Sequence, residues 1–163
     1  MLAVSNTSPL SCLASVDLLH LLPHQFHRVA IPQAVRIELG QHPHGYARRG
    51  VDDLIQKGYL QVRGIKNTDL KRSLRASLDE GESEAICLAL EQKSDILLLD
   101  EKDGRKAARI LDLALTGTVG ILLKAKHAGM IPSLREVLNK LASEFGFSLH
   151  PTLIEQVCIE VGE

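Results

Sequence analysis

Short apolar runs recur along the chain and are separated by longer stretches in which apolar residues return at helical spacing. Four consecutive aliphatic residues at 96–99 are typical of a strand that is buried on both faces of a parallel sheet. Five runs have the length and side-chain pattern of strands: residues 2–5, 28–31, 60–63, 95–100 and 113–116. Because these runs alternate with helical segments, we expect an α/β sandwich with a mostly parallel central sheet.

Helix start and stop signals divide the rest of the chain into short helices. Pro9 and Pro32 each suit a first helical turn, with Thr7 or Ser8 as the N-cap of the earlier helix, and Gly40 suits a helix end. The expected helices cover residues 9–14, 17–22, 32–40, 47–57, 68–77, 79–91, 101–113, 121–127, 133–144 and 151–161. No internal repeat or long linker interrupts the 163 residues. We therefore expect a single domain over residues 1–163, with residues 133–163 as a C-terminal helical extension.

Four carboxylates crowd the start of the helix expected at 79–91. Asp79 suits the N-cap, and Glu82 three residues later completes a capping box. The helix dipole favours acidic residues at this end by about 0.3–1 kcal/mol each. Glu80 and Glu84, however, are four residues apart and repel each other. A cation held close by would relieve the repulsion; the alternative is a solvated acidic helix start.

The composition narrows the class of protein. Apolar residues make up 45% of the chain, which predicts a folded core, but aromatic residues make up only 3% and Trp is absent. The core is therefore expected to be aliphatic, and base stacking on aromatic side chains is not expected. The formal net charge of −1 argues against a nucleic-acid field over the whole surface and leaves room for a local basic patch.

The cysteines and the N-terminus indicate a compartment. Cys12, Cys87 and Cys158 have neither metal-site spacing nor a pairing pattern, which fits a reducing cytosol better than secretion. The first residues lack the basic and apolar regions of a signal peptide, and no run reaches the ~18 apolar residues of a membrane span. We expect a cytoplasmic protein that does not enter a membrane.

Four oxygen-bearing side chains stand near element ends where the carboxyl edges of parallel strands can converge: Asn6, Glu38, Glu84 and Asp100. Oxygen ligands without Cys or paired His favour Mg²⁺ or Mn²⁺. Such ions support phosphodiester hydrolysis because they lower the pKa of a bound water. A structural alternative stays open for Glu38, whose charge in a last helical turn Arg36 could offset. His42 and His44 lack a third ligand, so we expect them to be exposed rather than to bind zinc.

Four segments, in this order, carry a likeness to a known family. They are Val4 to Leu10 (VSNTSPL), Ile31 to Leu39 (IPxAVxxEL), Gly81 to Ile86 (GExEAI) and Leu98 to Arg105 (LLDxxxGR). Together with Gly117 to Gly120 (GTVG), they resemble the PIN-domain superfamily, and within it the uncharacterised PIN-like branch related to VapC-type toxins.

This resemblance implies a three-layer α/β/α sandwich whose acidic pocket binds Mg²⁺ or Mn²⁺ and cleaves single-stranded RNA. Carried over by motif, Glu38, Glu84 and Asp100 match the second, third and fourth acids and would be catalytic. Asn6 stands where the first acid, an aspartate, is expected, and Thr7 or Ser8 would order the site. The implied metal ligands are Asn6, Glu38, Glu84, Asp100 and Asp103.

Asn6 is the departure from the pattern. Its amide oxygen can ligate a hard cation but carries no charge, so the metal affinity should fall. Glu82, Glu101 or Asp103 could supply the missing charge. Asp103 could equally serve only as a helix cap.

The leading interpretation is a metal-dependent endoribonuclease, a phosphodiesterase that is the toxin of a toxin–antitoxin pair. Its partners would be single-stranded RNA, a small antitoxin and a second copy of the chain, which Leu153, Ile154 and Val157 could bind unless they complete the monomer's own core. The candidate phosphate contacts, which solvated helix faces would explain equally well, are Lys71, Arg72, Arg75, Arg105, Lys106 and Arg109.

Two other interpretations stay open. A non-catalytic PIN-like module that binds nucleic acid or serves as a scaffold would have a degenerate acidic site, marked by Asn6. A receiver-like phosphotransfer domain is less favoured, because no Lys and Thr or Ser at strand ends are clearly placed for it.

Overall fold

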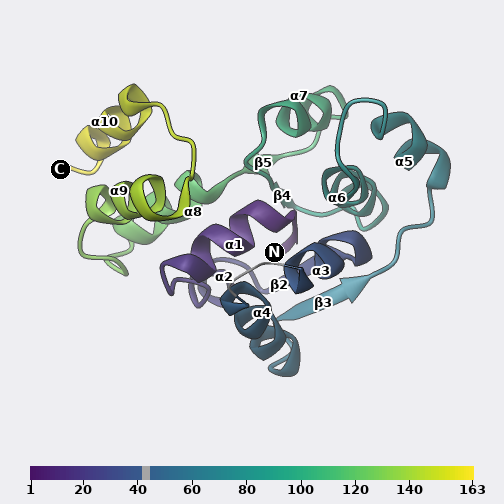
Figure 1. Ribbon diagram of the computed structural model, residues 1–163, viewed down its shortest axis with the longest axis horizontal. Coiled ribbons are helices and arrows are strands. Elements are labelled where there is room, and N and C mark those ends of the chain that lie inside the picture. Colours follow the sequence, from purple (N-terminus) through teal and green to yellow (C-terminus); the bar gives the residue numbers. More distant parts are fainter. Residues whose placement is uncertain (42–44) are drawn as a thin grey trace.

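The computed structural model describes residues 1–41 and 45–163 of the chain. Its core is a five-stranded, all-parallel sheet with the strand order β3-β2-β1-β4-β5 (Figure 1). The strands are β1 (Leu2–Ser5), β2 (Arg28–Pro32), β3 (Leu60–Arg63), β4 (Ile96–Leu98) and β5 (Leu115–Thr116). All five strands predicted from the sequence are therefore confirmed. His42 and His44 lie outside the described residues.

Helices connect and cover these strands. In chain order they are α1 (Thr7–Ser15), α2 (Leu21–Gln25), α3 (Gln33–Gly40), α4 (Tyr46–Gln56), α5 (Thr68–Leu74), α6 (Glu80–Glu91), α7 (Lys102–Ile110), α8 (Thr118–His127), α9 (Leu134–Phe145) and α10 (Pro151–Glu160). In Figure 1, α5, α6 and α7 lie together on one side, and α9 and α10 lie at the opposite end of the molecule.

The sheet separates two apolar clusters. Ala3 of β1 and Leu98 of β4 point into one cluster, while their neighbours Val4 and Leu97 point into the other, because successive side chains of a strand face opposite sides. Buried residues of α1–α4 and α8–α10 complete the first cluster, and those of α6 and α7 complete the second. This is the expected three-layer α/β/α sandwich, and its core is aliphatic, with Phe26 the one buried aromatic side chain among the described residues.

Some helix boundaries differ from the sequence prediction. Helix α1 begins at Thr7 with Asn6 as its N-cap, so Pro9 occupies the third helical position instead of the first. Proline is tolerated there because the N–H groups of the first turn have no partner within the helix. Helix α8 begins three residues before the expected start at residue 121, and the helix expected at 17–22 runs from Leu21 to Gln25.

The C-terminal segment packs on the first cluster. Leu134, Leu138 and Leu141 of α9 and Val157 of α10 are buried in it. Val157 therefore completes the core of its own chain and Ile154 packs against that core, whereas Leu153 is 39% exposed. No helix in the described part of the chain is long and apolar enough to cross a membrane.

Candidate functional site

The end of β1 places Asn6 at the carboxyl edge of the sheet. Its backbone N–H donates to the carbonyl of Leu98 (3.0 Å), which fixes it beside β4. Its side chain does not cap α1: Nδ2 donates to Oε2 of Glu101 (3.2 Å), and Asn6 is only 2% exposed. Its Oδ1 is buried and has no hydrogen-bond partner among the described residues. An unpaired buried acceptor costs about 1–3 kcal/mol, so this oxygen needs an explanation.

Glu38 reaches the same edge from the last turn of α3. Thr7, which follows Asn6, donates its hydroxyl to one carboxylate oxygen of Glu38, and the backbone N–H of Gly81 donates to the other (3.0 Å). Glycine at position 81 permits this contact, because a Cβ there would lie 2.5 Å from Oε1 of Glu38 and would force that side chain to move. Arg36 does not offset the charge of Glu38 but forms an ion pair with Asp52. The N-terminus of α6 takes that role.

Glu82 comes from the first turn of α6. The predicted capping box is confirmed: the N–H of Glu82 donates to Asp79 (2.7 Å), and the N–H of Asp79 donates to Oε2 of Glu82 (3.1 Å). The other oxygen of Glu82 lies over Gly104 of α7, where a Cβ would be 2.7 Å from it. The Glu82 carboxylate is therefore held, nearly buried, between α6 and α7.

The negative charges of these acids raise the pKa of Glu38 and of Glu82. Burial raises the pKa of the Glu38 carboxyl, and the negative charges of Asp79 and Glu101 raise it further against the bonds from Thr7 and Gly81. Burial likewise raises the pKa of Glu82, with added repulsion from Asp79, Glu101 and Asp103. We define the acidic pocket as Asn6, Glu38, Asp79, Glu82 and Glu101.

Glu84, one turn along α6, has different partners. Its Oε2 accepts from the backbone N–H of Ala34 in the first turn of α3 (2.9 Å), and Nζ of Lys71 binds its Oε1 (2.6 Å). Lys71 also binds Glu80 (2.7 Å), so the cation that relieves the repulsion between Glu80 and Glu84 is an ammonium group of α5. Helices α3 and α6 thus exchange glutamates: Glu38 accepts from the first turn of α6, and Glu84 accepts from the first turn of α3.

Asp100 is held at the N-terminus of α8. Its two oxygens accept from the backbone N–H (2.7 Å) and the hydroxyl (2.6 Å) of Thr118. Burial raises the pKa of Asp100, and the two bonds from Thr118 oppose that rise. A Cβ on Gly117 would collide with this carboxylate. Helix N-termini bind anions, and here the bound anion is Asp100 itself.

The structure therefore divides the residues predicted for the site. It brings Asn6, Glu38 and Thr7 together with Glu82 and Glu101, which the sequence offered only as replacements for a missing charge. The hydrogen bonds of Glu84 and Asp100 lead instead to Ala34, Lys71 and Thr118. Asp103 is exposed and acts on Glu82 through its charge; Ser8 lines a cavity beside Glu101.

The candidate phosphate contacts are similarly divided. Lys71 is engaged by Glu80 and Glu84, Arg72 pairs with Asp69 (3.3 Å), and Arg75 donates to the carbonyl of Leu78 (2.7 Å). Lys106 and Arg109 are exposed on α7. Arg105 lines a cavity beside Asp100.

In their chemistry, the donors of the acidic pocket fit a divalent metal ion, but no three His, Cys, Asp or Glu side chains of the described residues are placed as a group that could hold one. The fit rests on the unpartnered Oδ1 of Asn6, on its neighbour Glu101, and on the repulsion that Glu38 and Glu82 experience. An amide oxygen with carboxylates is a donor set for Mg²⁺ or Mn²⁺. A cation there would offset the repulsion and give Oδ1 a partner.

The sequence does not reveal that Glu82 and Glu101 lie beside Asn6 and Glu38. Glu82 is the third residue of a capping box, which is a sufficient structural role by itself. Glu101 directly follows Asp100 after β4, and the spacing does not reveal which of the two acids turns toward Asn6.

Comparisons with known proteins agree with this architecture. A sequence profile of the PIN domain matches residues 2–163. A PilT N-terminus domain protein from the hyperthermophilic archaeon Sulfolobus solfataricus has a similar fold, with a TM-score of 0.54 and 21% sequence identity, over 77% of this chain and 93% of that chain. No curated protein matches in sequence. PIN domains are usually nucleases and generally use divalent metal ions. The match over nearly the whole chain shows that it belongs to the PIN-domain family.

Proposed function

We propose that this protein is a Mg²⁺- or Mn²⁺-dependent endoribonuclease that acts on single-stranded RNA at the acidic pocket. Membership of a family whose members are usually nucleases supports the reaction class. The observation that carries the proposal is the buried, unpartnered Oδ1 of Asn6 next to Glu101, in a pocket where Glu38 and Glu82 repel nearby acids.

The residues of the pocket have separable roles in this proposal. Asn6, Glu38, Glu82 and Glu101 would hold the ion, which supplies Lewis-acid chemistry for phosphodiester hydrolysis when bound. Thr7 and the N–H of Gly81 orient the Glu38 carboxylate. Glu84 fixes α3 against α6, and Asp100 fixes the start of α8, so both support the pocket from outside. The family pattern instead makes Glu84 and Asp100 ligands themselves, and the two assignments differ in testable ways.

A cleavage assay on a labelled single-stranded RNA with Mn²⁺ tests the proposal. Glu82→Gln keeps the shape of the side chain but removes its negative charge, so it should retain the fold and reduce cleavage by about 10–100-fold. Exposed Glu144 of α9 offers a matched control, and Glu144→Gln should cleave like the wild type. Equal cleavage by the Glu82→Gln protein, or cleavage that survives EDTA, would contradict the proposal.

Glu84→Gln separates the two ligand assignments. If Glu84 only fixes the helices, its variant should lose stability and keep Mn²⁺ affinity within about tenfold of the wild type. If Glu84 is a ligand, as the family pattern implies, Mn²⁺ binding should be lost as completely as in Glu82→Gln. Calorimetric titration with Mn²⁺ distinguishes these results without depending on turnover.

A wider biological role extends the same proposal. We infer a cytoplasmic toxin that a small antitoxin protein restrains, with a homodimer as its functional form; the resemblance to VapC-type toxins is what supports this. Induced expression of the chain, compared with the uninduced host, tests the toxin role through growth of the host.

The uncharged Asn6 also favours a second candidate, a PIN-like module that binds RNA without cleaving it. Such a module would bind single-stranded RNA equally with and without Mn²⁺ and show no turnover. Asn6→Asp discriminates between the two, because a working but undercharged site should gain activity and a purely binding module should not.

A further inference from the structure

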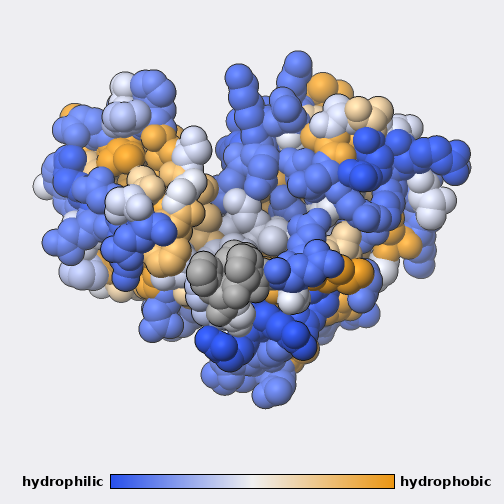
Figure 2. All heavy atoms as spheres, in the orientation of Figure 1, coloured by the Kyte–Doolittle hydropathy of each residue, from blue (hydrophilic) through white to orange (hydrophobic). Residues whose placement is uncertain are grey.

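Two adjoining cavities open beside the acidic pocket. One of about 400 Å³ lies between Arg105 and the segment that joins α9 to α10, and the other, of about 530 Å³, reaches Glu101. Both are lined by Asp100, Phe147 and Ser148. We call them together the Phe147 groove. Figure 2 shows a hollow between the part of the molecule that carries α9 and α10 and the hydrophilic side chains above the centre.

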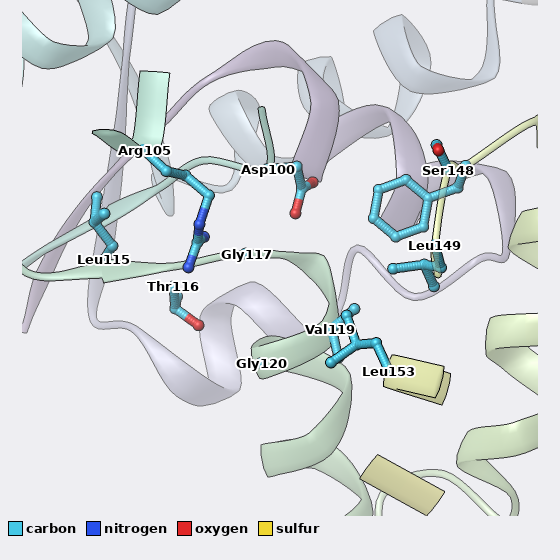
Figure 3. A pocket seen from close by; sticks show the side chains of 11 residues that line it. Asp100, Arg105, Leu115, Thr116, Gly117, Val119, Gly120, Ser148, Leu149 and Leu153 are labelled. Carbon is cyan, nitrogen blue, oxygen red and sulfur yellow. The ribbon is translucent and has the colours of Figure 1, made fainter. Parts of the chain in front are cut away.

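The walls of the groove differ in character. Phe147, Leu149 and Leu153 form an apolar wall on the C-terminal side. Figure 3 shows Arg105 on the other side of Asp100 from Ser148 and Leu149. The guanidinium of Arg105 is fixed by a hydrogen bond to the carbonyl of Leu99 (2.6 Å), and it lies close to Gly117.

The charge in the groove is less negative than its two acids suggest. Asp100 already accepts two hydrogen bonds from Thr118, and the guanidinium of Arg105 lies with it against Gly117. Glu101 accepts from Asn6 at the end that meets the acidic pocket. A further polar group is available in the larger cavity, where the buried hydroxyl of Ser11 has no partner among the described residues.

Two of the chain's three Phe residues line the groove. The sequence contains three Phe and two Tyr. Phe26 is in the core, whereas Phe145 and Phe147 both line the groove, and Tyr46 packs edge-on against Phe145 with the ring centres 6.3 Å apart. Aromatic residues are scarce in the composition, but the fold places Phe145 and Phe147 beside the candidate site.

We propose that the Phe147 groove binds a nucleotide of single-stranded RNA next to the bond that is cleaved, with its base on the Phe147 ring and its phosphate at Arg105. This inference rests on the proposed nuclease function and extends it to a substrate subsite. A flat aromatic ring beside a fixed guanidinium matches the π-face and the phosphate of a nucleotide. Cavities of this size are ordinary for ligands of that kind. An apolar protein segment would use Phe147 but would leave Arg105 and the continuity with Glu101 unexplained.

Fluorescence of 2-aminopurine tests the base contact directly. The probe is a six-nucleotide single-stranded RNA that carries 2-aminopurine at one position at a time, bound to the full-length protein in EDTA so that nothing is cleaved. At one or two positions, binding should quench the fluorescence by stacking, and Phe147→Leu should abolish this quenching and weaken binding about tenfold. Ile159→Ala, on an exposed residue of α10 outside the groove, is the control and should change neither.

The salt dependence of binding tests the phosphate contact. Arg105→Gln should weaken binding and reduce the slope of log affinity against log salt by about 0.7, the value of one phosphate contact in a single strand. Arg28→Gln is the matched control and should leave the slope unchanged, because Arg28 is exposed at the amino end of β2 and lines neither cavity. Thermal unfolding of each variant verifies that the fold is retained.

The possible outcomes separate the groove from the chemistry. The proposal is overturned if Phe147→Leu leaves quenching and affinity unchanged and Arg105→Gln leaves the salt slope unchanged, even if the wild type cleaves RNA. A groove that holds a protein segment should give this same result. Quenching that depends on Phe147, in a protein that never cleaves RNA with Mn²⁺, would keep the groove and reject the nuclease.

Discussion

Replacing Gly81 with alanine is the smallest change that should disturb the acidic pocket. A Cβ at this position would lie 2.5 Å from Oε1 and 2.7 Å from Oε2 of Glu38, closer than two such atoms can approach. The backbone of α6 is fixed by its capping box, so the flexible Glu38 side chain must move. It then loses the hydrogen bond from the N–H of residue 81.

The expected size of the effect follows from two opposing terms. Alanine in place of a helical glycine stabilises a helix by about 0.5–1 kcal/mol. A hydrogen bond to a charged group contributes about 1.5–3 kcal/mol, and this is lost when Glu38 moves. The variant should therefore be less stable by about 1 kcal/mol, which lowers Tm by about 2–4 °C for a chain of this length. Its Mn²⁺ affinity should fall by about 10–100-fold because a supporting contact of a ligand is gone.

Gly40→Ala provides the matched control. Gly40 is the last residue of the same helix that carries Glu38, and a Cβ there has no neighbouring atom within 4 Å among the described residues. This variant should gain stability, by up to about 1 kcal/mol, and bind Mn²⁺ like the wild type. Thermal unfolding and calorimetric titration measure both quantities. If Gly81→Ala also gains stability and keeps its Mn²⁺ affinity, Glu38 is not held against the start of α6 and the geometry of the pocket is wrong.

Four other variants give independent predictions. Lys71→Met leaves the buried Glu84 without its ion-pair partner, beside Glu80, and should lower the free energy of unfolding in urea by about 1–3 kcal/mol, less than for a fully buried pair. Adding Glu84→Gln should recover much of this loss, and strictly additive losses would contradict the ion pair. Because the folded-state pKa of Glu82 is raised, its contribution to stability is present below the unfolded pKa and is lost as the pH rises through the folded value. Glu82→Gln should therefore raise Tm by roughly a few degrees at pH 7.5 and not at pH 4, and an equal effect at both values would refute the pKa shift. The opposite sign applies to Glu163, whose pKa is lowered to about 2 by Lys126 and by the N–H groups of Leu134 and Arg135. Glu163→Gln should therefore lower Tm at pH 7, and the difference in Tm from the wild type should close as the pH falls from about 4.5 toward 2. Asn6→Asp should strengthen Mn²⁺ binding on the order of tenfold by adding a charged ligand, and weaker binding would mean that Asn6 does not face the ion.

Local patterns in the sequence were sufficient for much of the fold. The inner strands β1, β2 and β4 were predictable because each contains a short, mostly apolar run that is buried in a parallel sheet, and β3 because its apolar and polar residues alternate. The capping box of Asp79 and Glu82 was predictable because both partners lie within one helical turn. The start of α1 was not, because Pro9 fits a third helical position as well as a first.

The candidate site depended on contacts that no local pattern encodes. Glu82 and Glu84 are two residues apart on one helix. Only the packing of α6 against α3, α5 and α7 directs Glu82 to the acidic pocket and Glu84 to Ala34 and Lys71. Asp100 and Glu101 are adjacent in the chain, and the position of α8 decides that Asp100 binds Thr118. The Phe147 groove unites segments that are far apart in the chain, from Ser8 to Leu153.

Anomalous diffraction from a crystal soaked in millimolar Mn²⁺ tests the central claim most directly. We expect one anomalous peak bounded by Oδ1 of Asn6 and by carboxylate oxygens of Glu38, Glu82 and Glu101. A pocket that stays without Mn²⁺, or a peak bound only by Glu84 or Asp100, would contradict the assignment of the metal centre to this edge of the sheet.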